Sequence, residues 1–147
     1  MTSTQPTMEI FLRGRQYKKA LEQTSRSIRA DYGLKQIEVD ILSFLSYSGP
    51  VTSSEIYRTL SLNKGHVSQA MASLCTKGML RVKPDPHDKR RIAFHLSKQA
   101  APIVESIQKA RERLLEKVLR GVTEDELAVI QSVTEKVYAN LDQLVTV

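Results

Sequence analysis

The chain contains the sequence DPHDKRR at residues 85–91, set between MLRVK at residues 79–83 and IAFHL at residues 92–96. Short runs of alternating apolar and polar residues on either side of a charged turn predict a β-hairpin with a cationic tip. Each strand should then have one core face, made by Leu80 and Val82 on the first strand and by Ile92, Phe94 and Leu96 on the second. This hairpin decides the fold because of the helical patterns that precede it.

Two short helices separated by a tight turn are expected immediately before the hairpin. Thr52-Ser53-Ser54-Glu55 fits a capping box that opens the first helix. Ser61-Leu62-Asn63 is the expected turn, and Asn63 is a good N-cap for the second helix. That helix should bury one face and end at Gly78; its buried residues are Val67, Met71 and Leu74. Helix, turn, helix and charged hairpin together predict a winged helix-turn-helix that binds DNA.

Longer helices are expected on both sides of this segment. One helical pattern runs from about Thr7 to Asp31, and a second runs from Leu34 to Gly49-Pro50. After the hairpin, Ser97 is expected to cap a long helix over about Lys98–Arg120, which Gly121 ends. A second capping box, Thr123-Glu124-Asp125-Glu126, opens a final helix that runs to about Leu144.

The predicted fold class is therefore mainly α with a small β-hairpin wing (α+β). We expect one domain over residues 1–147, with a winged-helix DNA-binding lobe at about 34–97. The helices at about 7–31 and 98–144 carry more apolar residues than one small core can cover, which predicts that they form a homodimer. The alternative is that these helices pack only on one another within the chain.

Composition and charge narrow the possible functions. The chain has 147 residues and a net charge of +6, and residues 52–97 carry 8 basic against 3 acidic side chains. Such a surplus suits phosphate neutralisation, whereas the low aromatic content disfavours stacking on single-stranded nucleic acid. No apolar run is long enough for a membrane span, no signal peptide is recognised, and Cys75 is the only cysteine. These features favour a cytoplasmic location.

The sequence offers no candidate for catalysis or for a cofactor. The three histidines, His66, His87 and His95, lack the spacing of metal ligands, so no metal is expected. There is no Gly-rich phosphate loop and no nucleophile or carboxylate pair in a catalytic context, so the chain is not expected to be an enzyme.

From Gly33 to about Leu144, the chain resembles the MarR family of winged-helix transcription regulators. The resemblance follows four segments, namely 33–38, 51–56, 62–69 and 74–80. Its most specific part is residues 88–97, DKRRIAFHLS, which is similar to the family's wing signature. The resemblance implies a triangular homodimer whose terminal helices interlock, with recognition helices in major grooves and wing tips in minor grooves. It also implies a repressor, more often than an activator, that responds to small molecules or redox signals.

The outward face of the second short helix supplies the candidate base contacts. Because its buried stripe faces inward, the polar residues of its N-terminal half point away from the core; they are Asn63, Lys64, Gly65, His66, Ser68 and Gln69. Gln can contact adenine through two hydrogen bonds, and Lys can donate to guanine or phosphate. Gly65 has two interpretations, a close approach of backbone to DNA or simple tolerance in the first turn.

The hairpin tip supplies a second group of contacts. Arg90 matches the family's minor-groove arginine, and a guanidinium suits the negative potential of a narrow groove. Asp88 is expected to orient Arg90 through a charge-assisted pair, with Lys89 and Arg91 on phosphates. Ser53 and Ser54 are tentative phosphate contacts whose alternative role is helix capping.

Three questions stay open at this level. The alternative function is a winged-helix module for protein–protein interaction without DNA binding. An effector crevice of the kind seen in similar proteins could involve Tyr17, Tyr32, Ile41, Phe44 and Tyr47, although these residues are expected to be core. Cys75 is expected to be a small, half-buried residue rather than a redox sensor.

Overall fold

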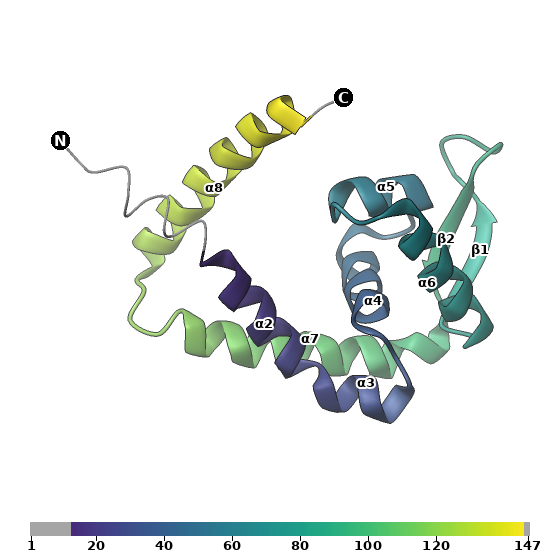
Figure 1. Cartoon of the computed structure of the whole chain (residues 1–147), viewed down its shortest axis with the longest axis horizontal. Helices are drawn as coiled ribbons and strands as arrows, with labels where there is room; N and C mark the ends of the chain where they lie inside the picture. The colour runs from purple at the N-terminus through teal and green to yellow at the C-terminus, as the bar shows by residue number, and fades with distance from the viewer. Residues whose placement is uncertain (1–12, 146–147) are drawn as a thin grey trace. The chain divides into compact units, whose positions relative to one another are not determined.

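The computed structural model describes residues 13–145, in two compact units that divide after Leu114. It confirms the predicted fold class, because helices dominate and the only sheet of the described residues is a two-stranded antiparallel hairpin (Figure 1). The elements in chain order are α2 (Gly14–Thr24), α3 (Arg26–Tyr32), α4 (Gln36–Ser48), α5 (Ser53–Thr59), α6 (Lys64–Thr76), β1 (Leu80–Pro84), β2 (Ile92–Leu96), η1 (Lys98–Ala100), α7 (Ala101–Val118) and α8 (Glu124–Val145).

The helix predicted from Thr7 to Asp31 is instead two helices, α2 and α3, so the prediction of one continuous helix is wrong. The interruption lies at Ser25, whose backbone leaves the helical region with ψ at 3°. The Ser25 hydroxyl is buried and donates to Gln36 Oε1 at 2.7 Å, which ties the break to the start of α4. Gly33 ends α3 with a φ of 63°, as expected. Positions 7–12 of this predicted helix lie outside the described residues.

The helix–turn–helix forms as the capping residues predict. The Glu55 amide donates to Thr52 Oγ1 at 3.4 Å, and the Thr52 amide donates to Glu55 Oε2 at 2.9 Å. Asn63 Oδ1 accepts from the amides of Gly65 and His66 at the start of α6. Gly78 follows α6 with a φ of 76°, and the Met79 amide donates back to the Leu74 carbonyl at 2.9 Å. Each end of α6 is therefore closed by a specific local interaction.

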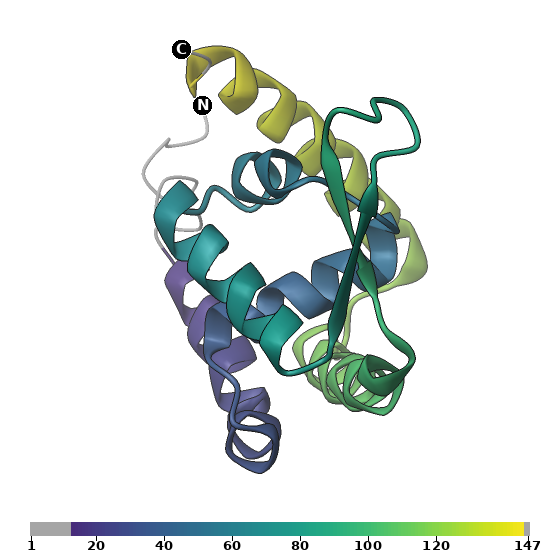
Figure 2. The same cartoon turned by 90° about the vertical axis from the view of Figure 1, so that its right-hand side faces the viewer.

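The hairpin has the predicted strands, but its predicted core faces are present only at the base, where Leu80, Phe94 and Leu96 pack on the core. Leu80 pairs with Leu96 at its base and Val82 pairs with Phe94 further out. Leu80 is buried and Phe94 is half-buried, but Val82 is 49% exposed and Ile92 is 55% exposed. The turn lies at the end of the hairpin away from η1, beyond the packed base (Figure 2). Burial falls from the base of the hairpin toward the turn, so strand alternation alone overestimates the burial of Val82 and Ile92.

Ser97 does not cap the following helix through its side chain, which corrects a second expectation. Its hydroxyl donates instead to the Gly78 carbonyl at 2.6 Å, and the Ser97 amide donates to the Met79 carbonyl at 2.9 Å. These two bonds fasten the end of β2 to the end of α6. A short 3₁₀ turn, η1, then leads into α7, which begins at Ala101 rather than at Lys98.

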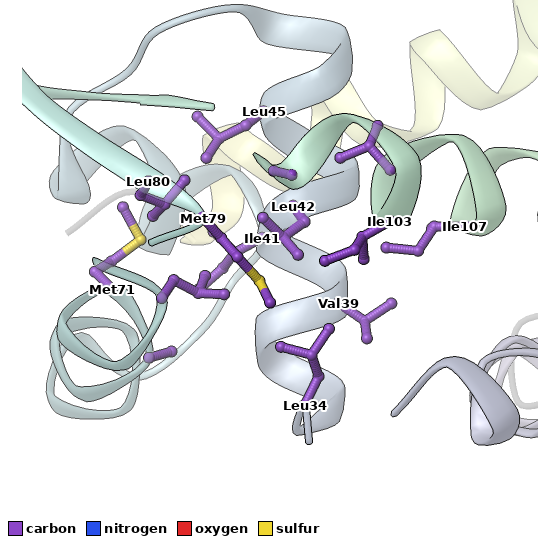
Figure 3. Close-up of a cluster of buried hydrophobic side chains, with 14 of the residues drawn as sticks. Leu34, Val39, Ile41, Leu42, Leu45, Met71, Met79, Leu80, Ile103 and Ile107 are labelled. Carbon is purple, nitrogen blue, oxygen red and sulfur yellow. The ribbon is translucent and has the colours of Figure 1, made fainter. Parts of the chain in front are cut away.

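One apolar core holds the N-terminal unit together. It is built from α4, α6, the base of the hairpin and the first half of α7, whose buried side chains converge in Figure 3. Ile41, Leu42 and Leu74 are fully buried, as are Val39, Ile56 and Val67. Burying side chains of this size stabilises the fold by about 1.5–3 kcal/mol each. This packing holds together the elements that carry the candidate contact residues.

The C-terminal unit contains the end of α7, the turn at Gly121 and α8. The capping box at its start forms as predicted, with the Glu126 amide donating to Thr123 Oγ1 at 3.2 Å. The apolar side of α8 is open to solvent: Leu127 is 41% exposed, Ile130 51% and Leu144 81%. Among the described helices, none is long and apolar enough to span a membrane.

Candidate nucleic-acid interface

The N-terminal half of α6 presents the six predicted contact residues on its surface. Val67, Ala70, Met71 and Leu74 face the core. The exposed residues are Asn63, Lys64, Gly65, His66, Ser68 and Gln69. This division follows from helical periodicity, since positions three and four residues apart share a face. The structure therefore brings these residues together on one helix face, as the sequence suggested.

Gly65 has a local reason that sequence reasoning did not identify. Its amide donates to Asn63 Oδ1 at 2.8 Å, and a Cβ at this position would lie 3.1 Å from the same oxygen. A side chain would therefore crowd the capping oxygen of Asn63. The cap by itself therefore accounts for a glycine at position 65, without a close approach of DNA.

The tip of the hairpin is organised around Asp88. Asp88 Oδ1 accepts from the Arg90 amide at 3.1 Å and from Arg90 Nε at 3.2 Å, and Asp88 Oδ2 lies 4.0 Å from Arg91 Nε. The predicted pairing of Asp88 with Arg90 is thus present. The Arg90 side chain is 91% exposed and that of Arg91 is 59% exposed. Lys89 is exposed as well, so all three basic side chains of the tip face solvent.

Ser53 and Ser54 are half-buried in the first turn of α5. The Ser54 hydroxyl lies 3.1 Å from the Thr52 hydroxyl, within the capping box. This contact matches the capping role that was the alternative to a phosphate contact. For Ser53, no side-chain contact within the described residues favours either role.

A buried charged cluster lies behind α6, and sequence reasoning assigned it no role. Glu38, on α4, is 1% exposed and accepts from the Lys35 amide, Ser73 Oγ and Lys77 Nζ, each at 2.9 Å. Burial opposes ionisation of Glu38, but these hydrogen bonds outweigh it and lower the pKa of the carboxyl. One signal was available: Glu38 precedes Leu42 by four residues and so lies on the apolar stripe of α4.

A cleft of about 320 Å³ lies within the N-terminal unit, between α2, α4, the turn before α6 and α7. Arg111 Nη2 donates to Asp40 Oδ1 at 3.1 Å, and Gln36 Nε2 donates to the same oxygen at 3.1 Å. Burial nevertheless raises the pKa of Asp40, and the two donors only partly offset it. Ser43 Oγ is buried in this wall without a hydrogen-bond partner among the described residues.

The crevice residues suggested by the sequence are only partly in this cleft. Phe44 and Tyr47 line it, whereas Ile41 is fully buried in the core. Tyr17 is 46% exposed, Tyr32 41% and Tyr47 72%, so the expectation that the tyrosines are core residues is wrong. The amphipathic pattern placed them near the core stripe, but a tyrosine can keep its ring edge and hydroxyl in water.

Cys75 is half-buried, and burial raises the pKa of its thiol above the ordinary value. A higher pKa leaves less thiolate, the reactive form, which agrees with the expected small packing residue. Within residues 13–145, no three His, Cys, Asp or Glu side chains gather in a way that could hold a metal ion.

Comparison with known proteins shows which family the chain belongs to. Residues 32–91 match the model of the MarR family. The transcriptional regulator AdcR of Streptococcus pneumoniae is 33% identical over 105 residues, which cover 69% of this chain and 71% of that protein. The chain belongs to the MarR family of transcriptional regulators. The multiple antibiotic resistance protein MarR of Salmonella typhimurium is 26% identical over 98 residues, covering 66% of this chain and 68% of that protein.

Solved structures agree on the fold of this MarR-family regulator. A MarR-family transcriptional regulator from Silicibacter pomeroyi is 16% identical and superposes with a TM-score of 0.79, covering 90% of this chain and 88% of that one. At that identity the likeness establishes a shared winged-helix fold and leaves the contact residues to be tested.

Proposed function

We propose that this regulator binds double-stranded DNA as a homodimer and represses transcription from a pseudo-palindromic operator. The observation that carries the proposal is the presence of two exposed polar surfaces on one compact unit, the N-terminal half of α6 and the basic hairpin tip. An α-helix fits the major groove of DNA, and an exposed arginine suits a narrow minor groove. Two such units in a dimer would read half-sites about one helical turn apart.

In this proposal, the side chains have different tasks. His66, Ser68 and Gln69 contact base edges, and Asn63 and Lys64 approach bases or phosphates beside Gly65 at the start of α6. Arg90 enters the minor groove, and Lys89 and Arg91 contact phosphates. Asp88 holds the turn in shape, because its carboxylate bonds both the backbone and the side chain of Arg90. Ser53 and Ser54 contact phosphates from the first turn of α5.

The homodimer is proposed from the apolar side of α8. Its exposed residues include Leu127, Ile130, Val133, Leu141 and Leu144. A continuous apolar helix face in water is unfavourable, and a second copy of the chain would cover it. Sedimentation should give a dimer for the wild-type protein, and Ile130→Glu should shift it toward monomer. A wild-type protein that sediments as a monomer at micromolar concentration contradicts this part of the proposal.

We further propose that the cleft beside Asp40 and Arg111 takes a small effector. Its wall combines apolar side chains such as Phe44 with the unpaired Ser43 hydroxyl, a mixture typical of small-ligand sites. A ligand screen by thermal shift should find compounds whose stabilising effect is lost in Ser43→Val. Equal stabilisation of both proteins would place the ligand elsewhere.

The central experiment is a fluorescence anisotropy titration of the protein against promoter DNA of its own gene, with scrambled DNA of equal length as reference. Arg90→Ala is expected to weaken specific binding by about 10- to 100-fold, since a contact to a groove or phosphate is worth about 1–3 kcal/mol. Circular dichroism should show an unchanged fold, because Arg90 is almost fully exposed.

Arg113→Ala is the matched control, because Arg113 is an exposed arginine on α7 and its loss changes the net charge equally. It should leave binding within about twofold of the wild type. Binding should also weaken steeply with salt through counterion release. If Arg90→Ala and Arg113→Ala bind equally well, the wing assignment fails.

A further inference from the structure

Glu38 links the start of α4 to the last turns of α6. Its two carboxylate oxygens receive the Lys35 amide at 2.9 Å, Ser73 Oγ at 2.9 Å, and Lys77 Nζ at 3.1 Å and 2.9 Å. Lys77 Nζ also donates to the Gly33 carbonyl at 2.8 Å. One buried carboxylate therefore joins the N-terminus of α4 to Ser73, on the last turn of α6, and to Lys77, the residue that follows α6.

Ser73, which bonds Glu38, lies on the same face of α6 as two of the proposed base contacts. His66, Gln69 and Ser73 follow one another at spacings of three and four residues, so they lie along one helix face. All three line a shallow pocket of about 230 Å³ against the start of α4, with Lys35 and Glu38 on the opposite wall. A rotation of α6 about its axis would therefore move Gln69 and break the Ser73 bond at once.

Apolar packing alone does not fix such a rotation well. The buried stripe of α6 consists of Val67, Ala70, Met71 and Leu74, whose apolar contacts are non-directional. Hydrogen bonds to a carboxylate have narrow distance and angle requirements. A buried polar network adds specificity to an apolar interface when every member is satisfied, as here.

We propose that Glu38 is a positioning residue that fixes the rotation of α6 on α4 through Ser73 and Lys77, and so sets where His66 and Gln69 meet the bases. This inference rests on the proposed DNA binding. Glu38 touches no DNA in this scheme; it acts on specificity through the helix. Its loss should therefore reduce discrimination between operator and other DNA more than it reduces attraction to phosphates.

The test compares Glu38→Gln with Glu55→Gln. Both carboxylates accept the N-cap amide of their own helix, but within the described chain only Glu38 also contacts α6. Glu38→Gln keeps the size of the side chain and loses the charge that holds Lys77. We expect its ratio of operator to scrambled-DNA affinity to fall about tenfold, the loss of one good base contact, with the salt dependence of scrambled-DNA binding unchanged. Glu55→Gln should keep the ratio.

A double variant separates positioning from general weakening. If Glu38 acts through Lys77, Glu38→Gln combined with Lys77→Met should lower the affinity ratio no further than Glu38→Gln alone. All titrations are made at a temperature where unfolding curves show each variant fully folded. An unchanged ratio in folded Glu38→Gln overturns the proposal, as does an equal fall in operator and scrambled-DNA binding.

A measurement without DNA keeps the two proposals apart. Spin labels at Ala72→Cys on α6 and Tyr47→Cys on α4, in a Cys75→Ala background, report the distance between the two helices. With labelled protein diluted in an excess of unlabelled protein, so that each dimer holds at most one labelled protomer, we expect a single narrow distance distribution in the otherwise wild-type protein and a broader or shifted one in Glu38→Gln. If the wild-type protein lacks operator specificity but the distribution still broadens in Glu38→Gln, the proposed DNA recognition is wrong and the positioning of α6 by Glu38 is supported. An unaltered distribution in Glu38→Gln overturns the positioning role.

Discussion

Two carboxylates in this protein hold basic side chains in opposite surroundings. The side chain of Glu38 is 1% exposed and its partner Lys77 is 31% exposed, whereas Asp88 is 36% exposed and Arg90 is 91% exposed. In the first pair the carboxylate is buried and its lysine stays partly exposed, whereas the second pair lies in water at the tip of a hairpin. Burial decides what each pair does: the inner one contributes stability and geometry, and the outer one leaves its arginine available to a partner.

The largest expected effect is on stability. Glu38→Ala should lower the free energy of unfolding by about 2–3 kcal/mol, because Ser73 and Lys77 lose their acceptor in a buried site. Asp88→Ala should lower it by less than about 0.5 kcal/mol, since exposed ion pairs are worth little. Urea unfolding at one fixed protein concentration measures both. Equal losses in the two variants would show that burial does not separate these pairs.

A second expected effect is the pH dependence of the inner pair. The folded-state pKa of Glu38 is lowered, so the charged carboxylate contributes stability that is fully present above its unfolded pKa, about 4.3. That contribution is lost as the pH falls through the folded pKa. The gap in unfolding free energy between wild type and Glu38→Gln should stay constant from about pH 7 to pH 5 and shrink below that range. A gap that widens in acid contradicts this assignment.

The smallest expected effect concerns Asp88 and Arg90. It separates two roles of Asp88, the shaping of the turn and the pairing of its charge with Arg90. Asp88→Asn keeps an oxygen that can accept from the Arg90 amide, whereas Asp88→Ala removes it. If turn geometry matters, Asp88→Ala should weaken operator binding by about three- to tenfold and Asp88→Asn should stay within about threefold of wild type. Anisotropy titrations at one salt concentration compare them. Equal weakening in both variants would instead assign the role of Asp88 to its charge.

Local sequence signals predicted the elements that carry the candidate site. Thr52, Asn63, Gly78 and Gly121 act at helix ends as their residue types suggest, and the caps they form are present. The exposed face of α6 and the basic tip of the hairpin also follow from local pattern. Such features depend on hydrogen bonds and backbone angles within a few residues, so neighbouring sequence is sufficient to specify them.

Predictions that needed distant partners were less successful. The break at Ser25 depends on Gln36, and the Ser97 hydroxyl bonds Gly78 instead of capping α7. Val82 and Ile92 have the pattern of core residues, yet about half of each is exposed near the turn. The two serine hydroxyls bond residues distant in sequence, and the burial of a strand residue depends on which distant residues pack beside it. Local sequence does not contain this information.

The sequence by itself determined the order of helices and hairpin, the two surfaces proposed to meet DNA, and the apolar side of α8. The tertiary structure decided how α6 is held, because the carboxylate of Glu38 meets Ser73 and Lys77 across 35 and 39 residues of chain. Helical periodicity marked Glu38 only as a charge on an apolar stripe. Its partners come together because the core packs α4 against α6, and a buried carboxylate is tolerated only where such donors converge on it.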